Sequence, residues 1–243
     1  MWKVIGASVP GSAHLRAGKG CDDASQWVAG SQVMCLTVAD GAGSRPLSSR
    51  GSRIAVDTVA ELAAALQRGE AAETDPRAWL TAVFVEVHRR IAEAAAGREH
   101  DRHDYATTLA IAVLMGDVIA IGQVGDTIAV VGGPGGYVSI APAPQFEYAN
   151  ETVFVTQSDF AGHLRLETVP ADGVDEVYLS TDGLRYKILD DLATSVPYDP
   201  FFADLGGFAR TAEAGSPAIE RFLTTVDDQT GDDLSLVVAV RLP

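Results

Sequence analysis

Short apolar runs recur along the chain and predict a protein rich in β-strands. Most runs are bounded by glycine, proline or acidic residues, which is typical of buried strands between turns. After residue 105 the runs follow one another without helices between them, so we expect antiparallel sheets. The predicted strands cover residues 2–9, 26–29, 33–39, 107–114, 118–124, 128–131, 137–140, 153–155, 163–169, 177–180 and 234–240.

Two long segments with apolar residues at helical spacing interrupt these strands. The first, over residues 54–67, follows the N-cap candidates Ser48 and Ser49. The second begins at Asp75-Pro76, a capping residue followed by a first-turn proline, and continues for about five turns. Shorter helices are predicted over residues 201–212 and 217–224, and loops over residues 12–20, 98–104, 141–150 and 186–200.

The order of these elements indicates the class of the fold. Strands come first, then two helices, many strands, short helices and a last strand, which differs from the strand–helix alternation of a parallel sheet. We therefore expect an α+β fold in which helices cover sheets. No linker, repeat or low-complexity tract divides the chain, so residues 1–243 are predicted to form a single domain.

Composition and charge narrow the choice of partners. Hydrophobic residues make up 47% and charged residues 21%, as in ordinary globular proteins. The net charge of −15 makes nucleic acid and anionic membranes poor partners, and it reflects a solvated acidic surface or carboxylates gathered around cations. Cys21 and Cys35 fit neither a disulfide framework nor a zinc pattern, so we expect reduced thiols. Because the sequence lacks a signal-peptide pattern and a membrane-spanning apolar run, we expect a cytoplasmic protein.

Aspartates with a glycine beside them lie at the ends of four predicted strands. They are Asp40, Asp126, Asp182 and Asp232, and the loop pair Asp22-Asp23 adds two more carboxylates. Hard carboxylate oxygens suit Mg²⁺ or Mn²⁺, and the lack of His and Cys ligands in these segments argues against zinc. Two ions would compensate the repulsion between the carboxylates and could activate a water for attack on a phosphoryl group. Each Asp-Gly pair alone is more often a simple turn, so only the joint pattern is informative.

Six short motifs carry a family resemblance. They are Asp22-Asp23-Ala24, Val38-Ala39-Asp40-Gly41, Thr107-Thr108-Leu109, Val124-Gly125-Asp126, Leu179-Ser180-Thr181-Asp182-Gly183-Leu184 and Asp232-Asp233-Leu234-Ser235. In this order they resemble the motifs of the metal-dependent Ser/Thr protein phosphatases, the PPM or type 2C family, and in particular its bacterial branch. The motifs span nearly the whole chain.

The resemblance implies both a fold and an activity. The fold would be a four-layer α-β-β-α sandwich, in which helices flank two antiparallel sheets and the metals lie in a channel at one end. The activity would be hydrolysis of phosphoserine and phosphothreonine in proteins by a metal-activated water, without a phosphoenzyme. The expected partner is then a phosphorylated protein, the substrate of a cognate Ser/Thr kinase. Two alternatives stay open: a binding or regulatory module with a weak or inactive site, and a phosphohydrolase for small metabolites.

The resemblance also implies metal ligands. Asp40 would bridge two Mn²⁺ or Mg²⁺ ions, and Asp182 and Asp232 would complete the shell of the first ion. The carbonyl group of Gly41 and, through a water, Asp22 would serve the second ion.

Further roles follow from the same comparison. Asp126 would help to hold a weaker third ion, and Asp23 would orient the nucleophilic water. Many members of the family carry an arginine before the acidic pair that grips the substrate phosphate. Here Arg16 or Lys19 would bind phosphate instead, and His14 would contact the phosphate or donate a proton.

Some positions depart from the family pattern or allow two interpretations. Ala42 replaces a histidine that often follows the Asp-Gly pair, which puts proton donation to the leaving group in question. Asp22 is one methylene shorter than the usual glutamate. Arg45 and Arg50 could reach a phosphate but are interpreted first as surface charges, and His163 is expected on a strand in a structural role.

Overall fold

The computed structural model describes residues 1–30, 33–70, 75–141, 152–213 and 217–243. One sheet contains β1 (Trp2–Val9), β6 (Ile128–Gly133), β7 (Gly136–Ser139), β9 (Glu176–Ser180) and β12 (Leu234–Arg241). The other contains β2 (Ala24–Ala29), β3 (Val33–Ala39), β4 (Leu109–Met115), β5 (Val118–Val124) and β8 (Arg165–Pro170). The helices are α1 (Ser12–Arg16), α2 (Ser48–Gln67), α3 (Pro76–Ala96), α4 (Arg185–Ile188), α5 (Asp199–Thr211) and α6 (Ala218–Leu223). Short pieces are the 3-10 helices η1 (Arg102–Tyr105), η2 (Phe160–His163) and η3 (Asp182–Leu184), and the strand pair β10 (Leu189–Asp191) and β11 (Val196–Pro197).

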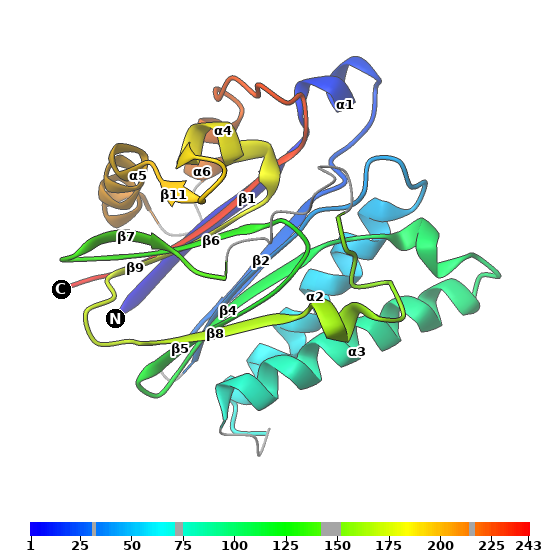
Figure 1. Ribbon diagram of the computed structural model, residues 1–243, viewed down its shortest axis with the longest axis horizontal. Helices are drawn as coiled ribbons and strands as arrows, with labels where there is room; N and C mark the ends of the chain where they lie inside the picture. Colours follow the sequence, from blue (N-terminus) through cyan, green and yellow to red (C-terminus); the bar gives the residue numbers. More distant parts are fainter. Residues whose placement is uncertain (31–32, 71–74, 142–151, 214–216) are drawn as a thin grey trace.

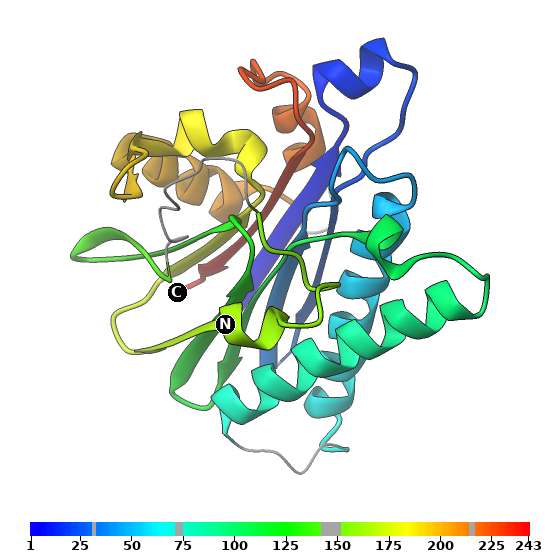
Figure 2. The same ribbon diagram turned by 45° about the vertical axis from the view of Figure 1, so that its right-hand side comes forward.

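These elements stack in four layers. Two five-stranded antiparallel sheets lie face to face, with strand orders β1-β12-β9-β6-β7 and β2-β3-β4-β5-β8. Helices α2 and α3 cover the outer face of the second sheet, and α4, α5 and α6 lie on the outer side of the first (Figures 1 and 2). The predicted α+β sandwich of two antiparallel sheets flanked by helices is therefore confirmed. No described helix is long and apolar enough to cross a membrane.

Strand periodicity explains how the layers adhere. In β3, Met34 and Leu36 point between the sheets, whereas Cys35 points to the helices α2 and α3. In β12, Val237 points between the sheets and Val238 points to the helices on the other side. Central strands are thus apolar on both faces, which is why they appear as continuous hydrophobic runs in the sequence.

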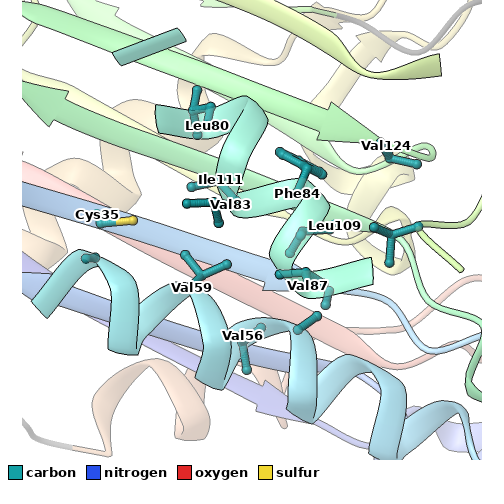
Figure 3. Packing of buried hydrophobic residues seen from close by; sticks show 14 of the residues in the cluster. Cys35, Val56, Val59, Leu80, Val83, Phe84, Val87, Leu109, Ile111 and Val124 are labelled. Carbon is teal, nitrogen blue, oxygen red and sulfur yellow. The ribbon is translucent and has the colours of Figure 1, made fainter. Parts of the chain in front are cut away.

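The layer formed by α2 and α3 shows the packing most clearly. Val56 and Val59 of α2, with Val83, Phe84 and Val87 of α3, are buried against the sheet (Figure 3). Each such side chain contributes about 1.5–3 kcal/mol on burial. The start of α3 is as predicted, because the Asp75 carboxylate accepts a hydrogen bond from the Arg77 N–H and Pro76 occupies the first turn.

Strand pairing brings several strand ends to one end of each sheet. Ala24, the first residue of β2, pairs with Ala39, the last residue of β3. Ser180, the last residue of β9, pairs with Ile128 at the start of β6 and with Leu236 near the start of β12. The acidic residues that flank these positions are consequently gathered rather than spread along the sheets.

The strand predicted over residues 153–155 does not form. The Val155 N–H donates to the Thr107 carbonyl (2.9 Å), and Nδ1 of His88 lies 2.7 Å from the Val155 carbonyl oxygen. Val155 is fully buried in the core beneath α3. Residues 153–155 are apolar because the Val155 side chain enters that core, and not because the segment pairs with a strand of a β-sheet.

Three other predictions need correction. The loop predicted over residues 12–20 contains α1, which begins with a hydrogen bond from the Leu15 N–H to the Gly11 carbonyl. His163 lies in η2 and not on a strand.

The third correction concerns the start of α2. This helix already includes Ser48, whose hydroxyl donates to the Arg45 carbonyl (3.0 Å), so neither Ser48 nor Ser49 is an N-cap.

The loop predicted over residues 141–150 lies, apart from Ala141, outside the described residues, as does Ser31 in a predicted turn. Cys21 and Cys35 are free thiols, as expected.

Candidate functional site

Asp40 follows β3 directly, and hydrogen bonds to the start of the next strand fix its backbone. The Asp40 N–H donates to Oγ1 of Thr108 (3.0 Å), and the Asp40 carbonyl accepts from the Thr108 N–H (2.9 Å) and the Thr107 hydroxyl (3.0 Å). Gly41 and Thr107 form an isolated antiparallel bridge. The two threonines therefore hold the Asp40 backbone against the segment that leads into β4.

Gly41 lies in close contact with the loop that carries Asp22. A Cβ atom on Gly41 would lie 2.4 Å from the Asp22 carbonyl oxygen and 2.9 Å from the Ser48 carbonyl carbon. The Ser52 hydroxyl of α2 also donates to the Asp22 carbonyl (2.5 Å). Only glycine fits between these backbones. The structure therefore places the backbones of Gly41 and Asp22 against each other.

Asp23 is buried where the two sheets meet. The Thr181 hydroxyl, at the end of β9, donates to Oδ2 of Asp23 (2.7 Å), and the Ser235 N–H of β12 donates to Oγ1 of Thr181 (3.0 Å). Burial raises the pKa of Asp23 well above its usual range, and the nearby Asp233 and Asp232 carboxylates raise it further, against the hydrogen bond from Thr181. The acidic ends of both sheets are thus joined at Asp23.

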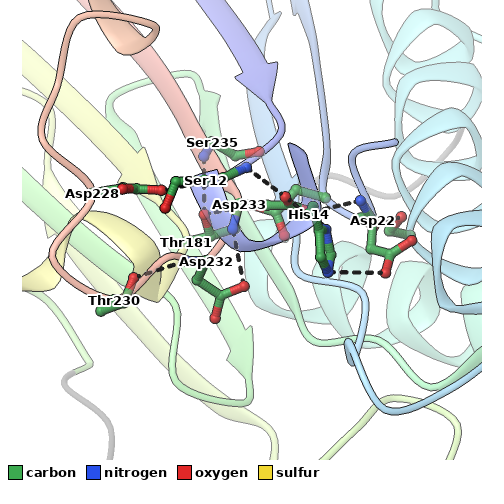
Figure 4. A network of polar contacts seen from close by, with 12 residues as sticks. Ser12, His14, Asp22, Thr181, Asp228, Thr230, Asp232, Asp233 and Ser235 are labelled. Carbon is green, nitrogen blue, oxygen red and sulfur yellow. Dashed lines mark hydrogen bonds and ion pairs between the residues drawn. The ribbon is translucent and has the colours of Figure 1, made fainter. Parts of the chain in front are cut away.

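Asp233 is the centre of a polar network that sequence reasoning missed (Figure 4). Its side chain, on a residue only 2% exposed, accepts hydrogen bonds from the Gly11 N–H (2.8 Å) and the Asp22 N–H (2.5 Å). Nδ1 of His14 lies 2.9 Å from Asp233 Oδ1, and Nε2 of His14 lies 3.8 Å from Asp22 Oδ2. The sequence feature that could have indicated this role is Asp233 itself, an acidic residue directly before the apolar run of β12. The family motif that this segment resembles has asparagine at that position.

Asp126 and Asp182 complete the acidic cluster. The Thr152 hydroxyl donates to Oδ2 of Asp126 (2.9 Å), whereas Oδ1 of Asp126 is buried without a hydrogen-bond partner among the described residues. The Arg165 guanidinium donates to the Gly125 carbonyl (2.7 Å) and so holds the turn before Asp126. Asp182 lies 3.4 Å from the Arg185 guanidinium. One buried carboxylate oxygen in this cluster therefore remains available to a ligand.

The carboxylates influence one another across the strand ends. Burial raises the pKa of Asp40 well above its usual range, and Asp23, Asp182, Asp126 and Asp232 raise it further. Burial also raises the pKa of Asp182 to about 6, with contributions from Asp126 and Asp232. Asp40, Asp182 and Asp232 are thus close enough to influence one another electrostatically, and Asp232 is exposed.

This donor set fits divalent cations that prefer oxygen ligands. The set consists of carboxylates and one carbonyl group, and Mg²⁺ and Mn²⁺ bind such oxygens. The unpartnered Oδ1 of Asp126 and the mutual repulsion of the carboxylates are both relieved by a cation. In the described ranges no three His, Cys, Asp or Glu side chains form a group that could hold an ion as they stand. Ion binding would therefore require these side chains to turn towards one another.

The predicted phosphate-binding residues lie on and after α1. The Arg16 guanidinium donates to the Ser12 hydroxyl within its own helix (3.0 Å) and is exposed. Lys19 lies close enough to Asp22 for its charge to oppose the rise in the pKa of that carboxyl, which burial causes. Of these two residues, only Lys19 is among the charges that influence the pKa of Asp22.

Comparison of this chain with known proteins finds protein phosphatases, both by sequence and by structure. The sequence pattern described as protein phosphatase 2C matches residues 10–224. The chain is 32% identical over 254 residues to serine/threonine-protein phosphatase 3 of Escherichia coli (strain K12), with 98% of each chain covered. A solved bacterial serine phosphatase gives a TM-score of 0.70 at 15% identity, covering 100% of this chain and 98% of the other. The serine/threonine phosphatase Stp1 from Staphylococcus aureus gives 0.64 at 16% identity, with 100% and 96% covered. The solved structures share the fold of this chain.

Proposed function

Because this chain belongs to the protein phosphatase 2C family, we propose that it hydrolyses phosphoserine and phosphothreonine in proteins with divalent metal ions as cofactors. The observation that carries the proposal is the meeting of carboxylates from both sheets around Asp40, where burial and the neighbouring carboxylates raise the pKa of Asp23, Asp40 and Asp182. Such a cluster is unfavourable unless cations compensate it. The substrate would be the product of a cognate Ser/Thr kinase.

The residues divide into two sets of metal ligands. Asp40 would contact two Mn²⁺ or Mg²⁺ ions, with Asp182 and Asp232 on one side and the Gly41 carbonyl and Asp22 on the other. The bound ions would supply charge neutralisation at phosphorus and a water of lowered pKa.

A third ion is proposed beside Asp126. Its unpartnered Oδ1 supports this role, because a buried carboxylate oxygen without a donor costs free energy that a cation would offset. Thr152 fixes the other oxygen of Asp126, and Arg165 holds the preceding turn. We propose that this position is shared with Asp182.

The remaining polar residues position the reacting groups. Thr181 holds Asp23 so that Asp23 can accept a hydrogen bond from the attacking water. Both ring nitrogens of His14 face carboxylates, so we propose that His14 orients Asp22 and Asp233, and that contact with the phosphate or proton donation is its second role. Of Arg16 and Lys19, we propose Lys19 as the phosphate-binding residue, because its charge acts on the Asp22 carboxyl. We propose one catalytic domain over residues 1–243, since the first and last strands pair and both adjoin the site.

The decisive experiment is turnover with and without metal. The purified protein is assayed on p-nitrophenyl phosphate and on a phosphothreonine peptide, in EDTA and in EDTA followed by excess Mn²⁺ or Mg²⁺. Hydrolysis of both substrates only with added metal is expected. Turnover in EDTA would contradict the metal requirement. Absence of turnover under all conditions would favour a binding module, and hydrolysis of small phosphate esters alone would favour a metabolite phosphatase.

A further inference from the structure

An open pocket of about 640 Å³ lies beside the start of α2. Its lining includes Cys21, Ser49, Arg50, Arg53, Arg98 and Tyr105. Three of these side chains are guanidinium groups, in a chain whose net charge is −15. The pocket is therefore a local concentration of positive charge on an acidic protein, which is the kind of feature that attracts an anion.

The three arginines form no ion pair with any described carboxylate. Elsewhere on the helical layer Arg89 and Arg90 form close ion pairs with glutamates. In the described part of the chain, no ion pair joins Arg50, Arg53 or Arg98 to a carboxylate. Arg98 donates one hydrogen bond to the Ala94 carbonyl and retains further donors. Several guanidinium donors in the pocket are consequently available to a ligand.

Local packing fixes the shape of the pocket. Arg50 and Arg53 are three residues apart on α2 and so lie on one face of that helix. Between them, a Cβ atom on Gly51 would lie 2.0 Å from the Tyr105 carbonyl oxygen, which shows how tightly α2 packs on η1. Tyr105 is buried and forms a rigid wall. The two arginines therefore extend from a backbone that is held in place.

The pocket adjoins the carboxylate cluster. Cys21, which lines the pocket, directly precedes Asp22. Ser52, next to Arg53 on α2, donates its hydroxyl hydrogen bond to the Asp22 carbonyl (2.5 Å). The pocket and the carboxylate cluster thus share the segment Cys21-Asp22 and the start of α2.

We propose that this arginine pocket binds a second anionic group of the substrate, close in sequence to the phosphorylated residue that is hydrolysed. The inference rests on the proposed function, because it names which phosphoproteins the site prefers. The chemistry it recognises is a phosphate or carboxylate group, which guanidinium binds through paired charge-assisted hydrogen bonds. Segments with two nearby phosphorylated residues, or with one beside acidic residues, are the preferred substrates.

The test uses three phosphothreonine peptides that differ at one neighbouring position, which is phosphoserine, glutamate or alanine. For the unmodified protein, KM is expected to be roughly tenfold lower for the phosphoserine and glutamate peptides than for the alanine peptide. In the double variant Arg50→Ala/Arg53→Ala this difference disappears, while turnover of p-nitrophenyl phosphate is unchanged. Arg221→Ala, an exposed arginine on α6 in the opposite helical layer, serves as the matched control and keeps the preference. A stronger effect of phosphoserine than of glutamate identifies a second phosphate as the ligand, and equal effects identify any acidic neighbour.

A binding measurement separates this inference from the proposed function. Fluorescein-labelled versions of the three peptides are titrated with protein in EDTA, and Kd is read from anisotropy. The pocket is supported, even without turnover, if the two acidic peptides bind the double variant more weakly than they bind the unmodified protein. High salt should remove this difference in Kd. Equal KM and Kd for all three peptides, or a preference that survives in the double variant, would overturn it. Failure to hydrolyse p-nitrophenyl phosphate would instead count against the proposed function.

Discussion

Nδ1 of His14 lies 2.9 Å from Oδ1 of Asp233, although 219 residues separate them in the chain. The Asp233 side chain is almost fully buried, and that of His14 is 13% exposed. The contact joins the first helix to the start of the last strand. Because Asp233 also binds the Asp22 N–H, this one carboxylate fixes the positions of His14 and of a proposed metal ligand together.

A double-mutant cycle with His14→Ala and Asp233→Asn tests this relationship. Removing the ring leaves a buried carboxylate with fewer donors, so the free energy of unfolding should fall by about 1–3 kcal/mol. Urea denaturation of the single and double variants should give a coupling energy above about 0.5 kcal/mol. The exposed pair His163 and Asp159, 3.6 Å apart, is the control and should show little coupling. Additive effects of His14→Ala and Asp233→Asn would mean that the contact is incidental.

Replacement of Asp40 tests the proposed metal centre. Asp40→Asn removes the carboxylate on which the other acidic groups converge, so hydrolysis should fall to background. Saturating Mn²⁺ should raise the Tm of the unmodified protein but not that of the variant, because such a rise depends on ion binding to the folded state. Asp204→Asn, an exposed carboxylate on α5, should change neither measurement. Full activity in the Asp40 variant would refute the assignment.

Thr181 should matter through Asp23 and not through contact with substrate. Thr181→Val keeps the shape of the side chain but leaves the Ser235 N–H and one Asp23 oxygen without their partner. We expect a loss of about 1–3 kcal/mol in unfolding free energy, together with a fall in kcat larger than the change in KM. Thr181→Ser retains the hydroxyl and should restore most of the activity. Equal loss in the valine and serine variants would point to packing instead.

Gly41 should tolerate no side chain. In Gly41→Ala the new methyl group would lie 2.4 Å from the Asp22 carbonyl oxygen, so the two backbones must separate. Overpacking of this kind costs about 1–3 kcal/mol, and the displaced Asp22 should lower activity and weaken activation by Mn²⁺. Gly20→Ala, where a Cβ atom meets nothing within 4 Å, is the matched control for thermal melts and turnover. Wild-type behaviour of the Gly41 variant would show that the loop can move freely.

Local patterns predicted most of the fold. The bounds of β1, β3 and β5 agree with the predicted strands, since apolar runs between turns have few alternative conformations in a sandwich. The strand predicted over residues 153–155 does not form, because an apolar segment can also arise where a side chain such as Val155 is buried outside a sheet. The start of α2 differs from the prediction because its first turns bury only the small residues Ser48, Gly51 and Ser52 and so lack a helical apolar stripe.

The candidate site was proposed from the sequence through its acidic residues, whereas the contacts that support them were not predicted. Strand-end aspartates and family motifs indicate Asp40 and Asp182 from the sequence. The roles of Thr181 and Asp233 depend on contacts between segments that are 158 or more residues apart, which no local pattern encodes. The arginine pocket is equally invisible in the sequence, because it forms only where the start of α2 meets Arg98 after the end of α3.

The pairing of β1 with β12 has a consequence for biosynthesis. Asp232 and Asp233 immediately precede β12, so a nascent chain on the ribosome lacks a complete acidic centre until these residues and the strand after them have left the exit tunnel. The proposed hydrolytic activity should then appear only once β12 has left the tunnel and paired with β1. A protease that detaches β12 would silence the protein even where the layer of α2 and α3 stays intact.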